Sequence, residues 1–277
     1  MKHLEGAFKN ARGDSIYTQA WLPDGDVKAV LFLVHGLGEY SGRYTNLVNH
    51  FVPLGYAVYG LDHLGHGKSD GGREIINRFD DYTAPLTTYL GMVKGSQPGK
   101  PVFIYGHSMG GLITCAYLLD HQTDFKGAIV SAPAIKVGES VSPSVILMGK
   151  VMSVIAPKAG VLALDPTGVS CDPEVVDAYV NDPLVFHGKT PARLAAEMLK
   201  AMMRVTAEVE KITLPLMVIQ GGADKLVDPG GAKMLYDRAS SKDKTLKVYE
   251  GFYHECHNEP ERATVFKDME DWLNAHL

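Results

Sequence analysis

Apolar residues in this chain gather into short runs that are separated by longer segments of mixed polarity. Each run is continuous rather than alternating and is too short for a typical helix. Such runs are typical of strands that are buried on both faces of a parallel sheet. They lie at Val30–Val34, Ala57–Leu61, Val102–Tyr105, Ala128–Val130 and Leu216–Ile219, and a last strand is predicted at Leu246–Tyr249.

Segments of helical length stand between these runs, and the alternation predicts a mostly parallel central sheet with helices on both faces. At the start of the chain, residues 4–9 and 15–22 alternate around a turn that contains Gly13 and Asp14. This pattern predicts an antiparallel hairpin at the edge of the sheet. The predicted helices are Tyr44–Leu54, Tyr82–Val93, Gly110–His121 and a closing helix over Pro260–Leu277.

The regular alternation stops after Pro133 and resumes at Leu214. We therefore predict a core of residues 1–133 and 214–277, and a helical cap of residues 134–213 inserted after the sixth strand. Residues 142–156 are apolar nearly all round, with Lys150 as the one charge, so a helix there has no polar face for solvent. We expect this helix to cover an apolar site, and an ordinary buried core helix is the alternative.

Length and charge limit the classes of protein. A chain of 277 residues can form one large core, and no second full domain is required. The formal net charge is -5, and Lys and Arg are scattered rather than clustered. A nucleic-acid partner is therefore not expected, because no basic stripe is present to bind phosphates.

Cysteine usage and the N-terminal segment bear on location. Cys115, Cys171 and Cys256 stand far apart without a CxxC pair, which indicates a reducing compartment. The first residues lack the apolar stretch of a signal peptide, so a cytoplasmic location is expected. The sequence contains no run of eighteen apolar residues, so no membrane-spanning helix is predicted. Transient contact of the apolar cap with a membrane surface stays an open alternative.

A nucleophile motif follows the predicted strand at 102–105. Gly106-His107-Ser108-Met109-Gly110 matches G-x-S-x-G between a strand and a helix. The glycines allow a turn so tight that a Cβ on either side of Ser108 would clash with neighbouring backbone. The turn also places Ser108 at a helix N-terminus, where the N–H of Met109 is expected to bind an oxyanion.

A second oxyanion donor is expected after the first core strand. The segment His35-Gly36-Leu37-Gly38 follows Val34 and is similar to the HG motif of esterases. The N–H of Leu37 is the predicted donor, with glycines on both sides that let the backbone approach the substrate carbonyl.

A serine nucleophile needs a base and an acid that orients the base. In folds with a G-x-S-x-G turn between strand and helix, the three residues follow in the chain order Ser, acid, His. His254 and His257 both follow the last strand directly, and His254, the nearer to the strand, is favoured. The preceding strand is followed by Asp224 and Asp228. Asp224 is favoured as the acid, because Asp228 stands before Pro229 where a helix cap is expected.

The segment Asp62-His63-Leu64-Gly65-His66 has two histidines at His-x-x-His spacing and a carboxylate, which is a spacing found in metal sites. The two glycines in this segment and after it indicate a loop, and no third ligand of matching spacing is visible. We therefore predict no metal and no cofactor.

Taken together, these stretches resemble the monoacylglycerol lipase branch of the α/β-hydrolases, which includes lysophospholipase-like esterases. The resemblance covers nearly the whole chain. It rests on HGLGEYSGRY at 35–44, DHLGHGKSD at 62–70, GHSMGG at 106–111, NDPL at 181–184, QGGADKLVD at 220–228 and KTLKVYEGFYHECHNE at 244–259. Outside 179–184 the cap matches poorly, so no acyl-chain preference is carried over.

The resemblance implies the site. It makes Ser108, Asp224 and His254 the triad, and Leu37 and Met109 the oxyanion hole; a smaller residue than Leu37 is usual in animal members. Glycerol contacts are implied for Glu39, Arg43, Tyr179 and His257.

The expected activity is hydrolysis of monoacylglycerols to glycerol and fatty acid through an acyl-enzyme. A broader carboxylesterase or lysophospholipase is the alternative, and a non-hydrolytic small-molecule receptor is a third reading. The receptor is disfavoured because it has no use for an activated serine.

Overall fold

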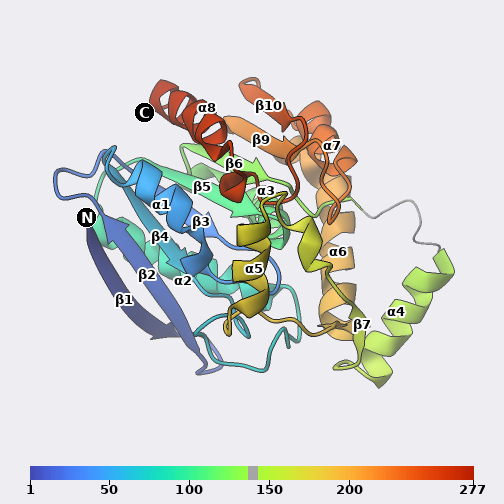
Figure 1. Ribbon diagram of the computed structural model, residues 1–277. Coiled ribbons are helices and arrows are strands. Elements are labelled where there is room, and N and C mark those ends of the chain that lie inside the picture. The colour runs from blue at the N-terminus through green and yellow to red at the C-terminus, as the bar shows by residue number, and fades with distance from the viewer. Residues whose placement is uncertain (137–142) are drawn as a thin grey trace.

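The computed structural model describes residues 1–136 and 143–277. Its centre is an eight-stranded sheet in the order β1-β2-β4-β3-β5-β6-β9-β10 (Figure 1). In the order of the sheet, every neighbouring pair of strands from β4 to β10 is parallel. The pairs β1–β2 and β2–β4 are antiparallel. The strands are β1 Lys2–Lys9, β2 Ser15–Leu22, β3 Ala29–Val34, β4 Tyr56–Leu61, β5 Val102–His107, β6 Gly127–Ser131, β9 Leu216–Gly221 and β10 Lys244–Tyr249.

The predicted runs coincide with the parallel strands, and the edge hairpin is present at β1 and β2. Its turn contains Gly13 at φ 87, a conformation that glycine adopts without strain. The helices are α1 Thr45–Phe51, α2 Asp80–Ser96, α3 Met109–His121, α4 Pro143–Ile155, α5 Pro173–Asn181, α6 Ala192–Glu208, α7 Gly230–Arg238 and α8 Arg262–Ala275. Among the described residues, none of these helices is long and apolar enough to cross a membrane.

Helices cover both faces of the sheet, as predicted. Strand β3 shows why: Val30, Phe32 and Val34 enter one apolar core, while Ala29, Leu31 and Leu33 enter the other. The first core includes residues of α2, α3 and α6, and the second includes residues of α1 and α8. The continuous apolar runs follow from this arrangement, because side chains of a strand point alternately to opposite faces.

The segment between β6 and β9 departs from the simple alternation. It holds α4, β7 Gly160–Leu162, α5, β8 Thr190–Pro191 and α6. Helix α6 packs against α3 and contributes Leu194 and Met198 to the core, whereas α4 projects from the periphery (Figure 1). Residues 137–142 of the predicted cap lie outside the described residues, and the cap boundaries at 134 and 213 stay a prediction.

Helix α4 differs from the sequence expectation. Five of its large apolar side chains are exposed to solvent rather than packed over a site: Leu147, Met148, Val151, Val154 and Ile155. Its apolar character therefore does not reflect burial within this chain.

Candidate active site

Ser108 occupies a sharp turn between β5 and α3. Its backbone lies at φ 57 and ψ -120, a conformation that is strained for a residue with a side chain. A Cβ on Gly106 would overlap Thr114, and a Cβ on Gly110 would overlap the carbonyl of Val34. The two motif glycines are thus required by close packing around the turn, in agreement with the strand-turn-helix prediction.

His254 and Asp224, the predicted base and acid, are in direct contact. The distance between His254 Nδ1 and Asp224 Oδ2 is 2.8 Å, and both side chains are almost fully buried. Asp224 Oδ1 accepts the backbone N–H groups of Leu226 and Val227 at 2.8 and 3.1 Å. Burial favours the neutral acid, but the hydrogen bond and charge of His254 outweigh it and lower the pKa of Asp224. The contact holds Nδ1 of the imidazole ring against the carboxylate, so the other ring nitrogen, Nε2, stays available to exchange a proton.

Asp228, the alternative acid, has other partners. Its carboxylate lies 2.8 Å from Lys136 Nζ and accepts the N–H of Gly230 at 2.8 Å, at the start of α7. The pKa of Asp228 is lowered mainly by the hydrogen bond from Lys136. Of the two aspartates, the structure therefore brings Asp224 to His254.

A cavity of about 230 Å³ joins the predicted residues. Ser108, His254, Leu37 and Met109 all line it, and so do Glu39 and Tyr179. The rest of the wall is largely apolar: Leu162, Leu164, Val169, Met198, Met202, Leu226 and Val227. Such a wall suits an acyl chain. The polar residues of the lining are Glu39, His107, Ser108, Lys136, Tyr179, Asp228, His254 and Glu255.

The loop of residues 35–39, here called the oxyanion loop, lies close to the serine. A Cβ on Gly36 would be 3.2 Å from Ser108 Cβ, so only glycine allows this approach without displacement. The N–H of Gly36 donates to Glu39 Oε1 at 2.6 Å, which fixes the turn directly before Leu37. The arrangement is compatible with a donor at Leu37, because its neighbouring peptide is already anchored.

Arg43 and His257, for which the resemblance implied glycerol contacts, pack against other residues of the chain. Neither is among the described residues that line the cavity. Arg43 forms a two-pronged ion pair with Glu255, and His257 stacks on Tyr44 with ring centroids 4.7 Å apart. Burial lowers the pKa of His257 to about 4. Direct contact of these two residues with a substrate therefore stays a prediction.

Sequence reasoning missed three polar residues of the wall, Glu255, His107 and Lys136. Glu255 adjoins His254 in the chain, which was an available signal. Its partner Arg43 is 212 positions away, and no pattern in the sequence predicts that pairing. His107 is buried between His254 and His257, at ring-centroid distances of 4.7 and 4.9 Å.

Residues 62–66, the alternative metal site of the sequence, form hydrogen bonds with residues in and next to the oxyanion loop. Asp62 accepts hydrogen bonds from Ser41 and from the N–H of Lys68. His63 and His66 are buried beside His35, and the N–H of His63 donates to His35 Nε2 at 2.9 Å. Within residues 1–136 and 143–277, no group of three ligating side chains is placed to hold a metal ion.

The strand order, the helices on both faces and the serine turn define an α/β-hydrolase. A model of the serine aminopeptidase S33 family matches residues 25–261. The chain belongs to this family of serine hydrolases.

Named relatives are similar over nearly their full length. A monoacylglycerol lipase of Mycolicibacterium smegmatis is 38% identical, over 99% of this chain and 98% of the relative. A monoglyceride lipase of Rattus norvegicus is 35% identical, over 97% and 89%. The crystal structure of a monoacylglycerol lipase from Paleococcus ferrophilus has a TM-score of 0.83 and 29% identity, with full coverage of both chains.

Proposed function

We propose that this protein hydrolyses the ester bond of monoacylglycerols, with glycerol and a free fatty acid as products. The observation that carries the proposal is the His254–Asp224 pair, at 2.8 Å, whose histidine lines a mainly apolar cavity together with Ser108. The relatives named for monoacylglycerol or monoglyceride hydrolysis support the substrate class.

The mechanism follows from the chemistry of these groups. Ser108 Oγ attacks the ester carbonyl while His254 Nε2 accepts its proton, and the N–H groups of Leu37 and Met109 bind the oxyanion. The tetrahedral intermediate expels glycerol, which takes the proton from His254, and an acyl-serine forms. Water then attacks this ester, with His254 again as the base, and the fatty acid leaves.

Covalent labelling tests the nucleophile. A fluorophosphonate should form one adduct, located at Ser108 by peptide mass spectrometry, and Ser108→Ala should abolish both adduct and turnover. Without a functional triad, only ~10³- to 10⁴-fold acceleration over water is expected. An active enzyme whose Ser108 stays unlabelled would contradict the proposal, and a protein with neither adduct nor turnover would favour the non-hydrolytic receptor.

A substrate panel tests the ester class. We expect monoacylglycerols to be cleaved with a higher kcat/KM than diacylglycerols, lysophospholipids and p-nitrophenyl esters. Equal values across the panel would favour a general carboxylesterase, and preference for lysophospholipids would favour that alternative.

Glu39 and Tyr179 are the proposed contacts for glycerol hydroxyls, because both are polar residues that line the cavity together with Ser108. Tyr179→Phe removes one hydroxyl and keeps the ring that stacks on Arg43 at 4.6 Å. We expect it to lower kcat/KM for monoacylglycerol more than for p-nitrophenyl butyrate. Equal losses on the two esters would contradict a glycerol contact.

We also propose that α4 contacts the lipid surface that contains the substrate. The exposed fractions of Val154 and Ile155 are 71% and 75%, and Leu147 and Met148 add to the same helix. A group of exposed apolar side chains on one helix is typical of a surface that binds lipid or protein.

A further inference from the structure

Catalysis needs the oxyanion loop and the loop of residues 251–258, here called the base loop, to hold one relative position. The first follows β3 and the second follows β10, and β5, β6 and β9 lie between these strands. Adjacent strands are ~4.8 Å apart, so β3 and β10 are about 19 Å apart in the sheet. Hydrogen bonds of the sheet therefore do not join the two loops directly.

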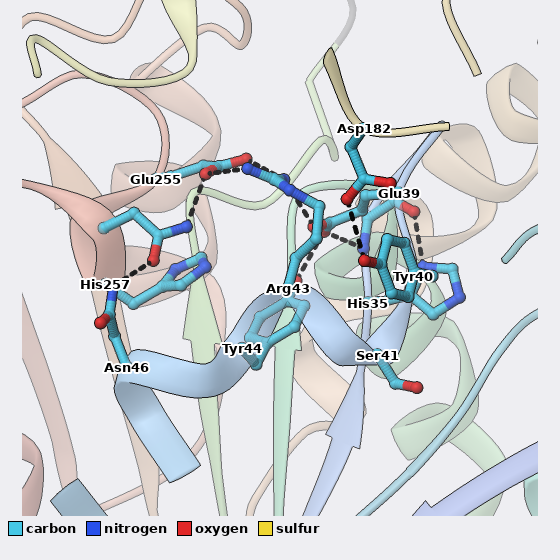
Figure 2. A network of polar contacts seen from close by, with 12 residues as sticks. His35, Glu39, Tyr40, Ser41, Arg43, Tyr44, Asn46, Asp182, Glu255 and His257 are labelled. Carbon is cyan, nitrogen blue, oxygen red and sulfur yellow. Dashed lines mark hydrogen bonds and ion pairs between the residues drawn. The ribbon is translucent and has the colours of Figure 1, made fainter. Parts of the chain in front are cut away.

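Arg43 joins them instead. Its Nη1 and Nη2 donate to the two carboxylate oxygens of Glu255 at 2.6 and 2.9 Å, and Nη1 also donates to Glu39 Oε2 at 3.0 Å (Figure 2). The exposed fractions of the three side chains are 9% for Arg43 and 3% for each carboxylate. A two-pronged guanidinium–carboxylate pair fixes distance and orientation together.

Each carboxylate of this bridge is attached to a part of the site. Glu39 Oε1 accepts the N–H of Gly36 and the hydroxyl of Tyr44, both at 2.6 Å, so it anchors the peptide before Leu37. Glu255 follows His254 directly, and Asn258 donates to its Oε2 at 2.7 Å. Moving either carboxylate would therefore move a proposed oxyanion donor or the proposed base.

Protonation agrees with this geometry. Burial opposes ionisation of Glu255, but the charge and hydrogen bonds of Arg43 outweigh it and lower the pKa of Glu255 to about 2. The Arg43 guanidinium keeps its charge because its pKa is raised by the two carboxylates, against the effect of burial. The pair is thus ionised whenever the enzyme works near neutral pH.

We propose that Arg43, bridging Glu39 and Glu255, is a positioning residue that sets the oxyanion loop relative to His254. It acts through those groups and not by touching the substrate. This inference rests on the proposed function, since it assumes that Ser108 forms an oxyanion intermediate. Its signature is a loss of transition-state binding without a loss of substrate binding.

The test must avoid leaving an unpaired charge in the interior, which would destabilise the fold. The double variant Arg43→Met/Glu255→Leu removes both charges of the two-pronged pair and keeps similar volumes. Burial raises the pKa of Glu39, so this carboxyl can take up a proton once Arg43 is gone. Its kcat on p-nitrophenyl butyrate should fall ~10- to 100-fold, the effect of a small misplacement of reacting groups. KM should change less than about threefold, because Arg43 does not line the cavity and p-nitrophenyl butyrate has no glycerol hydroxyls for Glu255 to bind.

Transition-state affinity gives a second readout. A trifluoromethyl ketone adds to the serine and forms an oxyanion, so its Ki should rise by the same factor as kcat/KM falls. Fluorophosphonate titration of Ser108 counts competent sites and corrects for misfolded protein. Glu255→Gln keeps the shape of the side chain and one hydrogen-bond acceptor. It should change kcat and Ki in the same directions by smaller factors, and it replaces the double variant if that variant does not fold.

The control is Arg204→Met/Asp120→Leu. In this exposed pair, Arg204 Nη2 donates to both carboxylate oxygens of Asp120, at 2.7 and 2.9 Å. The pair joins α6 to α3 and contacts neither loop. It should leave kcat and Ki unchanged.

Wild-type kcat and Ki in the bridge variants would overturn the inference, and so would a raised KM at constant kcat. Failure of the wild type to label at Ser108 would instead overturn the proposed function.

Discussion

At the scale of single residues, identical carboxyl groups differ through their surroundings. Asp224 and Asp228 stand four positions apart after the same strand. Asp224 meets an imidazole and two backbone N–H groups, whereas Asp228 meets Lys136 and the first turn of α7. Only the first set of contacts can orient a base.

Asparagine at these two positions should therefore have unequal effects. Asp224→Asn should lower kcat by ~10⁴-fold, because the amide favours the wrong imidazole tautomer. Asp228→Asn, the matched control, keeps a cap for Gly230 and should change kcat by less than about threefold. Steady-state hydrolysis of p-nitrophenyl butyrate measures both, and a larger loss in Asp228→Asn would reverse the assignment.

At the scale of elements, a buried carboxylate attaches the segment between β6 and β9 to the base loop. Glu259 accepts the N–H of Tyr253 at 2.7 Å and the hydroxyl of Ser170 at 3.1 Å. The N–H of Cys171 donates to it as well, and the N–H of Glu255 donates to Val169 at 2.8 Å. Residues 168–171 are thereby held against the loop that carries His254.

Glu259→Gln should weaken this attachment, because an amide presents N–H groups to donors. We expect the free energy of unfolding to fall by ~1–3 kcal/mol, the range for an unsatisfied buried group. Exposed Glu261→Gln is the matched control and should stay within about 0.5 kcal/mol of the wild type. Urea denaturation followed by fluorescence measures both, and equal stabilities would show that Glu259 is not an anchor.

The exposed face of α4 gives a second prediction at this scale. Val154→Asp/Ile155→Asp should reduce the fraction of protein that sediments with phosphatidylcholine vesicles, because charged groups disfavour insertion below the headgroups. Hydrolysis of dissolved p-nitrophenyl butyrate should be unchanged. Met92→Asp, at an exposed apolar position of α2, is the control and should bind like the wild type. Equal sedimentation of all three proteins would contradict the lipid contact.

At the scale of the whole molecule, the interior contains several imidazoles that folding keeps neutral. Burial lowers the pKa of His63 to about 3 and that of His66 to about 4, and it holds the pKa of His35 well below the ordinary value. The buried histidines are His35, His63, His66, His107 and His257, in addition to His254.

These histidines should make the fold sensitive to acid. Below pH 6.5 these histidines bind protons in the unfolded chain but stay neutral in the folded chain. The free energy of unfolding therefore falls as pH decreases towards 4. The loss is about 1.4 kcal/mol per pH unit for each such histidine. Tm measured from pH 7 to pH 5 should fall steeply, His66→Gln should flatten the slope, and exposed His121→Gln should not. A Tm that does not change with pH would contradict the prediction.

Much of this protein was determined by local sequence. Apolar runs such as Val30–Val34 specified strands, because a strand buried on both faces needs no polar residue. The glycines around Ser108 specified the turn, since only they permit its close backbone contacts. These features depend on neighbours in the chain, and the positions of Ser108, Asp224 and His254 after β5, β9 and β10 followed from them.

Other features were decided only by tertiary structure. The choice between Asp224 and Asp228 depends on which side chain reaches His254, and the bridge from Arg43 to Glu255 joins residues 212 positions apart. The apolar sequence of α4 predicted a helix that covers an apolar site, but five of its large apolar side chains are exposed to solvent. Sequence patterns record which side chains avoid water, whereas ion pairs and helix placement depend on distances that exist only once the sheet has brought remote loops together.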